Sequence, residues 1–252
     1  MDYVLLIYEA EDRRQKATSE EHTQMMAEYG QFTRDLAASG RLGDSAPLEP
    51  TRTATTVQVR NGKRVVTDGP FAETREQLGG YYVIKTETAE QALELAARVP
   101  SARLGSIEVR PVMSLGLPDI PAARASSDDQ RKEYILLIYE NESVWKDLDE
   151  ATRKARNARY GEFTRTIVAS NHFVDGAPLQ SVKTAESVRV PSGKRLVTDG
   201  PFAETREQLG GYYRVRADHL DQALDMAARI PAAETGSIEV RPILDLGAHL
   251  GS

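Results

Sequence analysis

The sequence predicts an α+β protein built from two ferredoxin-like repeats with inserted hairpins. One block of seventeen residues, VTDGPFAETREQLGGYY, occurs twice without change, at Val66–Tyr82 and at Val197–Tyr213. The same offset of 131 residues relates the rest of the two halves. Each half follows the order strand, helix, hairpin, strand, helix, strand, which is typical of a βαββαβ-type unit with an added hairpin.

Each repeat begins with a strand and an amphipathic helix. The apolar runs Tyr3–Tyr8 and Tyr134–Tyr139 are rich in strand formers and predict two central strands. Thr18 with Glu21 three residues later has the spacing of a capping box, which predicts that the first helix begins there. Asn171 follows the second copy of this helix and tolerates the left-handed conformation that ends a helix.

A hairpin and three further elements complete each repeat. Two alternating segments flank Asn61 and Gly62, a pair that supplies the two positive-φ residues of a tight turn, and Ser192 and Gly193 occupy the same place in the second repeat. The remaining elements of the first repeat are expected at Gly80–Lys85 (strand), Thr88–Val99 (helix) and Ser106–Val112 (strand).

The repeats set the predicted domain boundaries. Residues 1–113 form the first repeat, 114–131 a linker rich in Pro, Ser and Asp, 132–247 the second repeat and 248–252 a tail. A four-stranded sheet with both helices on one face leaves its other face bare, so each repeat needs a partner. We therefore expect the repeats to pack as an intramolecular dimeric α/β barrel, which could still form a homodimer through its edges or helices.

Composition excludes several classes of function. The chain has no cysteine, which excludes disulfides and thiol catalysis, and its net charge of −6 is unfavourable for binding nucleic acid. The apolar run at the N-terminus is too short for a signal peptide or a membrane span, so we expect a cytoplasmic protein that binds no membrane. The repeats share no histidine, and no phosphate loop or metal-ligand spacing occurs, so we expect neither cofactor nor metal.

Asp68 opens the turn Asp-Gly-Pro inside the repeated block, and Asp199 is its copy in the second repeat. The side chain of an aspartate at this position accepts hydrogen bonds from neighbouring backbone N–H groups, so a turn is the simplest role. The alternative is catalytic, because a carboxylate beside a cavity can act as a general acid or base. Asp68 and Asp199 are therefore candidate catalytic residues.

The rest of the block offers candidate ligand contacts. Arg75 and Arg206 can form local ion pairs on a solvated turn, or they can hold a polar ligand with their planar guanidinium groups. Tyr81 and Tyr82 point to opposite faces of a strand, so one packs under the helices, and the sequence leaves open which one. The hydroxyl groups of Tyr81 and Tyr212 are candidate ligand contacts.

The run GSIEVRP is the second one that both repeats share unchanged. Ile107 and Val109 lie on one face of this strand, so the charged residues between them lie on the other. If the apolar face packs under the helices, the charges face into the barrel. There they form an ion-pair network or line a polar cleft, because unpaired burial is too costly. The charged residues are Glu108 and Glu239, as candidate acid–base groups, and Arg110 and Arg241, as candidate ligand contacts.

The repeated block and the GSIEVRP strand together resemble the DGPF branch of the YCII-related proteins, over nearly the whole of both repeats. The resemblance implies a ferredoxin-like dimeric α/β barrel with a cleft between its units. It also implies a regulatory role, since members of this branch are associated with extracytoplasmic-function sigma factors. The histidine–aspartate dyad suggested for YCII-like proteins cannot be transferred, because Tyr29 and Tyr160 with the glycines after them occupy that part of the helix.

Three functions agree with the sequence. The first is a protein that binds a small polar molecule in the cleft between repeats, with a regulatory role. The second is a YCII-like enzyme in which a carboxylate performs acid–base chemistry and an arginine or tyrosine stabilises developing negative charge. The third is a structural or adaptor protein without a ligand, in which the repeated block serves only the fold.

Overall fold

The computed structural model describes residues 1–71, 74–113, 129–202 and 205–245. The predicted tail and most of the predicted linker lie outside these residues. The chain forms two compact units, and each unit combines parts of both repeats. The first unit comprises residues 1–48, 73–113 and 179–204, and the second comprises 49–72, 114–178 and 205–252. We call residues 49–72 and 179–204 the arms, because each arm belongs to the unit built mainly from the other repeat.

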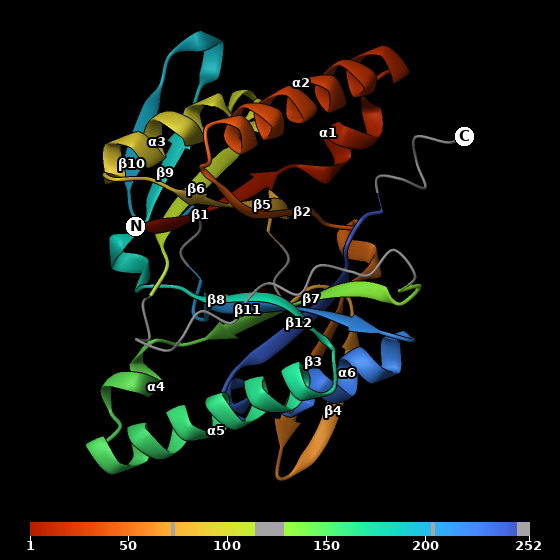
Figure 1. The fold of residues 1–252 in the computed structure, drawn as a ribbon, viewed down its shortest axis with the longest axis vertical. Helices are drawn as coiled ribbons and strands as arrows, with labels where there is room; N and C mark the ends of the chain where they lie inside the picture. The colour runs from red at the N-terminus through yellow and green to blue at the C-terminus, as the bar shows by residue number, and fades with distance from the viewer. Residues whose placement is uncertain (72–73, 114–128, 203–204, 246–252) are drawn as a thin grey trace. The chain divides into compact units, whose positions relative to one another are not determined.

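The first unit is built on a six-stranded antiparallel sheet. Its strands from the first repeat are β1 (Asp2–Glu9), β2 (Leu42–Pro47), β5 (Gln77–Lys85) and β6 (Ser106–Pro111), and those from the arm are β9 (Glu186–Arg189) and β10 (Leu196–Asp199). The sheet order is β10-β9-β6-β1-β5-β2, so β1 is a central strand, as predicted. The arm extends the sheet by pairing β9 with β6, and Figure 1 shows the two strands side by side.

The second unit repeats this arrangement with the arm of the first repeat. Its strands are β7 (Lys132–Glu140), β8 (Phe173–Pro178), β11 (Gln208–Ala217) and β12 (Ser237–Pro242), with β3 (Thr55–Arg60) and β4 (Lys63–Asp68) from the arm. The sheet order is β4-β3-β12-β7-β11-β8, in which β12 pairs with β3. The fold class is therefore α+β with two ferredoxin-like repeats and inserted hairpins, as the sequence predicts.

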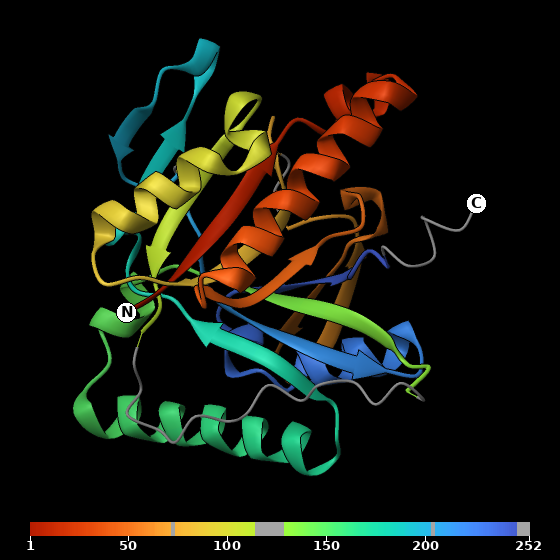
Figure 2. The same cartoon turned by 45° about the horizontal axis from the view of Figure 1, so that its top comes forward.

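Two long helices cover one face of each sheet. The helices of the first unit are α1 (Glu11–Lys16), α2 (Ser19–Ala38) and α3 (Ala89–Arg98), with the short 3-10 helices η2 (Pro100–Arg103), η3 (Val182–Thr184) and η4 (Pro191–Gly193). Those of the second unit are α4 (Ser143–Lys146), α5 (Glu150–Ala169) and α6 (Leu220–Ala228), with η1 (Thr51–Thr53) and η5 (Pro231–Glu234). In Figure 2, α2 and α3 lie over the same face of the first sheet.

The hydrophobic core of each unit lies between its sheet and these helices. In the first unit Phe32 and Leu36 of α2 pack with Leu93 of α3 and with Ile107 of β6. The arm contributes Val188, which is completely buried in this core, and Val57 of the other arm has the same place in the second unit. Full burial of one valine stabilises a fold by roughly 1.5–3 kcal/mol, so each arm anchors itself in the core that it joins.

Several local predictions are confirmed. The hydroxyl of Thr18 accepts a hydrogen bond from the N–H of Glu21 at 3.2 Å, and the Glu21 carboxylate accepts one from the N–H of Thr18 at 2.7 Å, which completes the capping box. Asn171 ends α5 with a φ of 56°. The turn residues predicted for both hairpins also have positive φ: Asn61 (53°), Gly62 (70°), Ser192 (52°) and Gly193 (78°).

The structure adds a strand that the predicted order omits. β2 lies at the edge of the first sheet, where it pairs with β5. Its sequence LGDSAP contains residues that are depleted in strands, and an edge position is where a proline is tolerated. The predicted order therefore needs one correction: a strand stands between the first long helix and the hairpin. Packing of the two units as a barrel stays a prediction.

Candidate functional site

The face of each sheet opposite the helices carries the charged residues of the shared strand. Ile107 and Val109 belong to the core under α2 and α3, as predicted. Glu108 and Arg110 alternate with them and therefore point to the other face, where both are almost completely buried. Glu239 and Arg241 are buried in the same way on β12 of the second unit.

Each glutamate pairs with the arginine two residues along its own strand. The Glu108 carboxylate lies 2.9 Å from a terminal nitrogen of Arg110. In the second unit the Arg241 Nε donates a hydrogen bond to Glu239 at 3.0 Å, and a second guanidinium nitrogen contacts the same oxygen. The predicted ion pairing of these four residues is thus present as one pair in each unit. Their predicted catalytic and ligand-binding roles stay predictions.

The phenylalanine of the repeated block closes over each pair. Phe202, from the arm in the first unit, donates its backbone N–H to Glu108 at 3.1 Å, and its ring stacks on Tyr8 of β1 with 4.7 Å between ring centroids. We call Tyr8, Glu108, Arg110 and Phe202 the first junction. The second junction consists of Tyr139, Glu239, Arg241 and Phe71, whose N–H donates to Glu239 at 3.0 Å and whose ring stacks on Tyr139 at 4.8 Å.

The two tyrosines of the repeated block have different surroundings. Tyr82 faces the helices, where its hydroxyl lies 2.8 Å from that of Thr33, and burial raises its pKa. Tyr81 points to the opposite face and donates a hydrogen bond to Asp44 at 2.6 Å. Tyr212 in the second unit bonds Asp175 at 2.8 Å in the same manner. Tyr81 and Tyr212 thus lie on the same face as the junctions, and their role as ligand contacts stays a prediction.

The other predicted site residues lie at the surface. Asp68 and Asp199 are exposed at the ends of β4 and β10, the outer strands of the two arms. Gly69, directly after Asp68, has a φ of 100° and donates its N–H to Ala54 at 2.8 Å, which agrees with a turn. Arg75 and Arg206 are also exposed, just before β5 and β11. The structure does not bring these four residues to the buried pairs, and their predicted roles stay predictions.

A second polar cluster lies near the end of β1 and differs between the units. Tyr29 of α2 donates a hydrogen bond to Ser101 at 2.6 Å, and Ser101 donates one to Glu9 at 2.8 Å. Burial raises the pKa of the Tyr29 hydroxyl well above its usual value, and the nearby negative charge of Glu9 adds to this shift.

In the second unit the corresponding carboxylate is Glu140, which has other partners. The indole N–H of Trp145 donates to it at 2.8 Å, and Arg156 and Thr235 bond its other oxygen. Burial raises the pKa of Tyr160, the counterpart of Tyr29, and the charge of Glu140 contributes. These contacts tie α5 to its sheet, so both carboxylates have a structural role that the sequence analysis did not identify.

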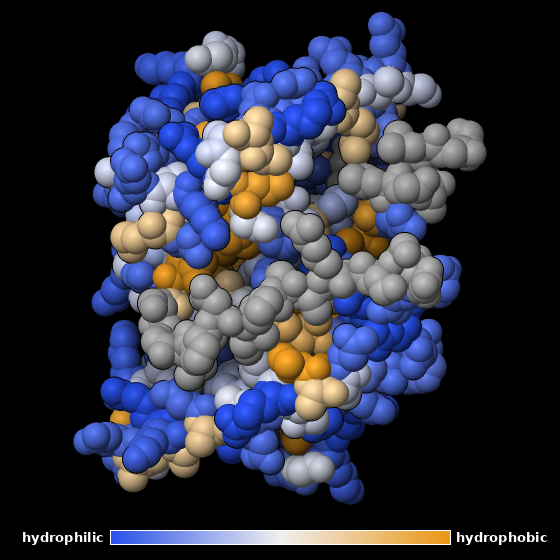
Figure 3. All heavy atoms as spheres, in the orientation of Figure 1, coloured by the Kyte–Doolittle hydropathy of each residue, from blue (hydrophilic) through white to orange (hydrophobic). Residues whose placement is uncertain are grey.

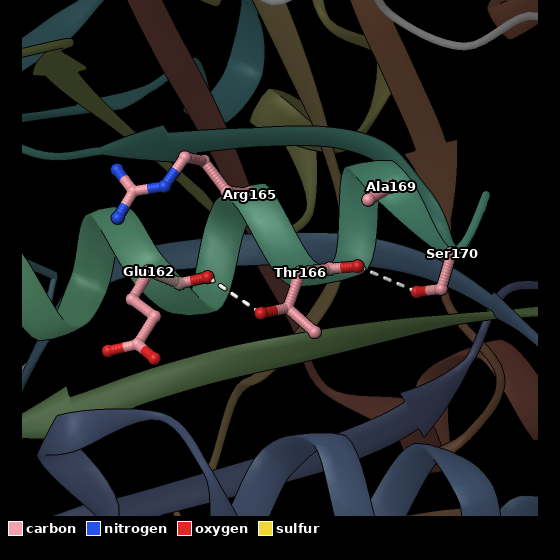
Figure 4. A pocket seen from close by; sticks show the side chains of 5 residues that line it. All are labelled: Glu162, Arg165, Thr166, Ala169 and Ser170. Atoms are coloured by element: carbon pink, nitrogen blue, oxygen red, sulfur yellow. Dashed lines mark hydrogen bonds between the residues drawn. The ribbon is translucent and has the colours of Figure 1, made fainter.

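A pocket lies along one side of α5, away from the predicted residues (Figure 4). Four residues of this helix and the residue that caps its C-terminus line it: Glu162, Arg165, Thr166, Ala169 and Ser170. The hydroxyls of Thr166 and Ser170 donate to carbonyl groups of their own helix at 2.8 Å each. On the face drawn in Figure 3, hydrophilic residues cover most of the described surface. The α5 pocket offers no buried polar group and carries no functional assignment.

Sequence reasoning missed four residues at or beside the junctions, two on central strands and two on the arms. Tyr8 and Tyr139 were assigned only to apolar strands, although the period of two along β1 puts Tyr8 on the same face as Leu6, away from Leu5 and Ile7. Arg189 and Gln58 were not identified at all. They lie on the arms and come beside β6 and β12 because the arms pair with these strands. This pairing connects residues from different repeats, so it leaves no local signal in the sequence.

The sequence profile of the YCII-related domain matches residues 1–115 and again 133–247. The chain belongs to the YCII-related family. An uncharacterized protein of Rhizobium meliloti (strain 1021) is 36% identical over 124 residues, which are all of that protein and 48% of this chain. This YCII-related protein thus contains two copies of a domain that occurs singly in that relative.

Solved structures with a similar chain path have little sequence in common with this YCII-related protein. A putative chlorite dismutase, TA0507, is 10% identical, with a TM-score of 0.44 and coverage of 99% of this chain and 97% of the other. A heme-binding protein from Thermus thermophilus is 13% identical, with a TM-score of 0.45 and coverage of 100% and 94%. A mutant chlorite dismutase from Candidatus Nitrospira defluvii is 10% identical, with a TM-score of 0.46 and coverage of 99% and 93%.

None of the helices within the described residues combines the length and the apolar character that crossing a membrane requires.

Proposed function

We propose that this YCII-related protein binds a small polar molecule at an arm–sheet junction. The observation that supports this most directly is the burial of a glutamate–arginine pair at each junction, with both members at most 2% exposed. Burying two charges removes their hydration, and their mutual attraction often does no more than compensate for this loss. A hydrophobic pair of similar size serves a purely structural role as well or better, so two such pairs favour recognition of a polar ligand.

The surroundings of the pair suit a small ligand. The stacked rings of Tyr8 and Phe202 supply an apolar wall beside the charges of the first junction, and Tyr139 and Phe71 supply the same wall at the second. Binding sites for small molecules commonly combine apolar walls with a few fixed polar groups. The N–H of each phenylalanine holds one carboxylate oxygen, which fixes the glutamate in position. The regulatory role and the sigma-factor association implied by the resemblance stay predictions.

Saturation-transfer NMR with four small probes tests this function: acetate, glycine, acetamide and urea. At least one probe is expected to give a saturable signal with the full chain. The double variant Glu108→Gln, Glu239→Gln keeps the shape of both side chains but removes their charge, and it is expected to weaken that signal. Asp12→Asn, at an exposed carboxylate of α1, is the matched control and is expected to leave the signal unchanged.

Native mass spectrometry of the purified chain provides the second measurement. Because the buried pairs are closed to solvent, a natural ligand is expected to stay bound through purification and to add its mass to the protein. Absence of any added mass, together with absence of a signal from all four probes, contradicts the proposed function. Circular dichroism of each variant shows whether a lost signal merely reflects unfolding.

A further inference from the structure

The two junctions share the strand GSIEVRP, yet their polar atoms are paired differently. At the second junction Ser237 accepts a hydrogen bond from the side-chain amide of Gln58 at 2.8 Å and donates one to Glu207 at 3.3 Å. The Nε of Arg241 donates to Glu239 at 3.0 Å. The buried polar groups of this strand thus find their partners inside the unit.

At the first junction three buried polar atoms have no hydrogen-bond partner among the described residues: Ser106 Oγ, Glu108 Oε1 and Arg110 Nε. Glu108 Oε1 lies 2.9 Å from a terminal nitrogen of Arg110, but the two groups are not aligned as a hydrogen bond. Arg110 instead turns its other terminal nitrogen to the carbonyl of Gln180, at 3.3 Å. Nearly all buried polar atoms of native proteins have a hydrogen-bond partner, so these three atoms indicate a partner that comes from outside the described part of the chain.

One difference between the arms accounts for the unpaired serine. The strand register places Arg189 of β9 opposite Ser106, where the second unit has Gln58 opposite Ser237. Arg189 is longer than glutamine and reaches Glu76 directly, at 3.1 Å. Its guanidinium also lies over the ring of Phe202, 5.8 Å from the ring centroid. Ser106 therefore loses the partner that glutamine gives to Ser237.

The chemistry of the unpaired atoms defines the ligand. Arg110 Nε–H needs a hydrogen-bond acceptor, and Glu108 Oε1 needs a donor. A serine hydroxyl can pair with a donor or with an acceptor. The charges of Glu108 and Arg110 already balance each other, as do those of Glu76 and Arg189, so no net charge is left for an ion. A carboxylate ligand meets repulsion from Glu108, and an ammonium ligand meets repulsion from Arg110. A primary amide or a urea offers a carbonyl acceptor and an N–H donor side by side without charge.

We infer that the first junction, and not the second, holds one small uncharged molecule of the amide or urea class, an assignment that rests on the ligand-binding function proposed above. Its carbonyl oxygen accepts from Arg110 Nε–H, and its N–H group donates to Glu108 Oε1. Ser106 supplies a further contact from the same strand. The second junction is closed by its own side chains.

Arginine-selective NMR of the full chain tests this inference, with acetamide as the probe and acetate as its charged control of similar size. Acetamide is expected to shift the Nε–H signal of Arg110 in a saturable manner and to leave that of Arg241 in place. Acetate is expected to bind at Arg110 at least about tenfold more weakly than acetamide. It has a charged oxygen, which Glu108 repels, in place of the amide N–H that donates to Glu108. Substitution of each arginine by lysine assigns the two signals.

Variants of the arm separate this site from a general effect on the fold. Arg189→Gln gives Ser106 the partner that Ser237 has, and is expected to weaken acetamide binding about tenfold. Ser106→Ala removes one contact and is expected to weaken binding several-fold, which keeps the test valid if Arg189→Gln does not fold. Arg195→Gln, directly before the outer strand of the same arm and with an exposed partner in Glu90, is the matched control and is expected to change nothing.

Three results overturn the inference. One is an equal response of Arg110 and Arg241 to acetamide, and another is tighter binding of acetate or glycine than of acetamide; both leave the proposed function intact. The third is a crystal structure grown with acetamide in which only water contacts Ser106, Glu108 and Arg110. If no probe binds and no molecule co-purifies at either junction, the proposed function fails as well.

Discussion

Single glycines decide how closely the backbone of β1 approaches the turn before β6. A Cβ atom added at Gly105 lies 2.0 Å from the backbone oxygen of Tyr8, and one at Gly236 lies 2.1 Å from that of Tyr139. No side-chain movement relieves such a contact, because the obstacle is main chain. These glycines therefore fix the position of the strand that carries the buried ion pair.

Gly105→Ala is expected to lower the free energy of unfolding by about 3 kcal/mol, the upper range for overpacking in a core. Chemical denaturation measures this change. Gly30→Ala in α2 is the matched control, because its Cβ meets only the end of the Arg34 side chain, at 3.3 Å. It is expected to be neutral or to stabilise the helix by up to about 1 kcal/mol. Similar effects of the two substitutions contradict the close approach at Gly105.

The buried tyrosines predict a loss of stability at high pH. Burial, with smaller contributions from Glu9 and Glu140, raises the pKa values of Tyr29 and Tyr160 above the ordinary value of 10.0. A folded-state pKa above the unfolded one gives stability that is complete below the unfolded value and is lost as the pH rises toward the folded one. The free energy of unfolding is therefore expected to fall from about pH 10 upward.

Denaturation between about pH 8 and pH 11, together with the phenolate absorbance, checks this dependence. Tyr29→Phe keeps the ring but removes the ionisable group, so this variant is expected to show a shallower decline above about pH 10. The variant also loses the hydrogen bond to Ser101, which lowers the free energy of unfolding at neutral pH as well as at high pH. An unchanged pH dependence in Tyr29→Phe shows that this hydroxyl does not contribute.

At the scale of single residues, the sequence predicts faces better than partners. The period of two placed Ile107 and Val109 in the core and Glu108 on the other face, because alternation follows from strand geometry alone. It left Tyr81 and Tyr82 undecided, since both are amphipathic and either can pack under a helix. The unpaired state of Ser106 depends on the residue opposite it in the other repeat, which no local pattern reveals.

Equivalent elements in the two repeats are held by ion pairs of opposite polarity. Glu28 of α2 pairs with Arg103 of η2, whereas the corresponding positions in the second unit carry Arg159 of α5 and Glu234 of η5. The charges of the helix and the turn are thus exchanged as a pair. Each long helix is complementary in charge to the turn of its own repeat, and the corresponding turn of the other repeat carries a charge of the same sign as the helix residue.

Glu28→Arg is expected to lower the free energy of unfolding by about 0.5–1 kcal/mol, because Arg103 then faces a like charge on a solvated surface. Adding Arg103→Glu recreates the polarity of the second unit and is expected to restore most of the loss. A double-mutant cycle by thermal denaturation measures the coupling, which salt is expected to reduce. Additive effects of the two substitutions exclude a contribution from this ion pair.

The long elements were predictable because their signals are local. The capping box at Thr18 and the turn pair Asn61 and Gly62 act through their own neighbours, so they mark a helix start and a hairpin in any fold. β2 was not predictable on these grounds. Gly43, Asp44 and Pro47 weaken it as a strand, and its place depends on pairing with β5, which lies well beyond it along the chain.

At the scale of the whole molecule, the exchange of arms makes the compact units depend on both repeats. Without residues 179–204 the first unit loses β9 and the completely buried Val188, and β6 becomes an open edge. Without the second repeat as a whole, the arm of the first repeat also has no sheet to join, because its partner strand β12 is absent. Val57 occupies the position of Val188 in the second unit, so an arm of either repeat can fill the same place.

An isolated first repeat, residues 1–113, is therefore expected to form a homodimer in which two copies exchange arms. Each copy then receives a valine and a pairing strand for β6, the same contacts that the second repeat supplies in the full chain. Light scattering after gel filtration measures the mass, and the unfolding midpoint is expected to rise with protein concentration, as for any folded dimer that dissociates on unfolding. Replacing residues 49–72 by a short Gly–Ser linker is expected to abolish dimerisation and cooperative unfolding together. A monomeric repeat that unfolds cooperatively at a concentration-independent midpoint contradicts the dependence of each unit on the exchanged arm.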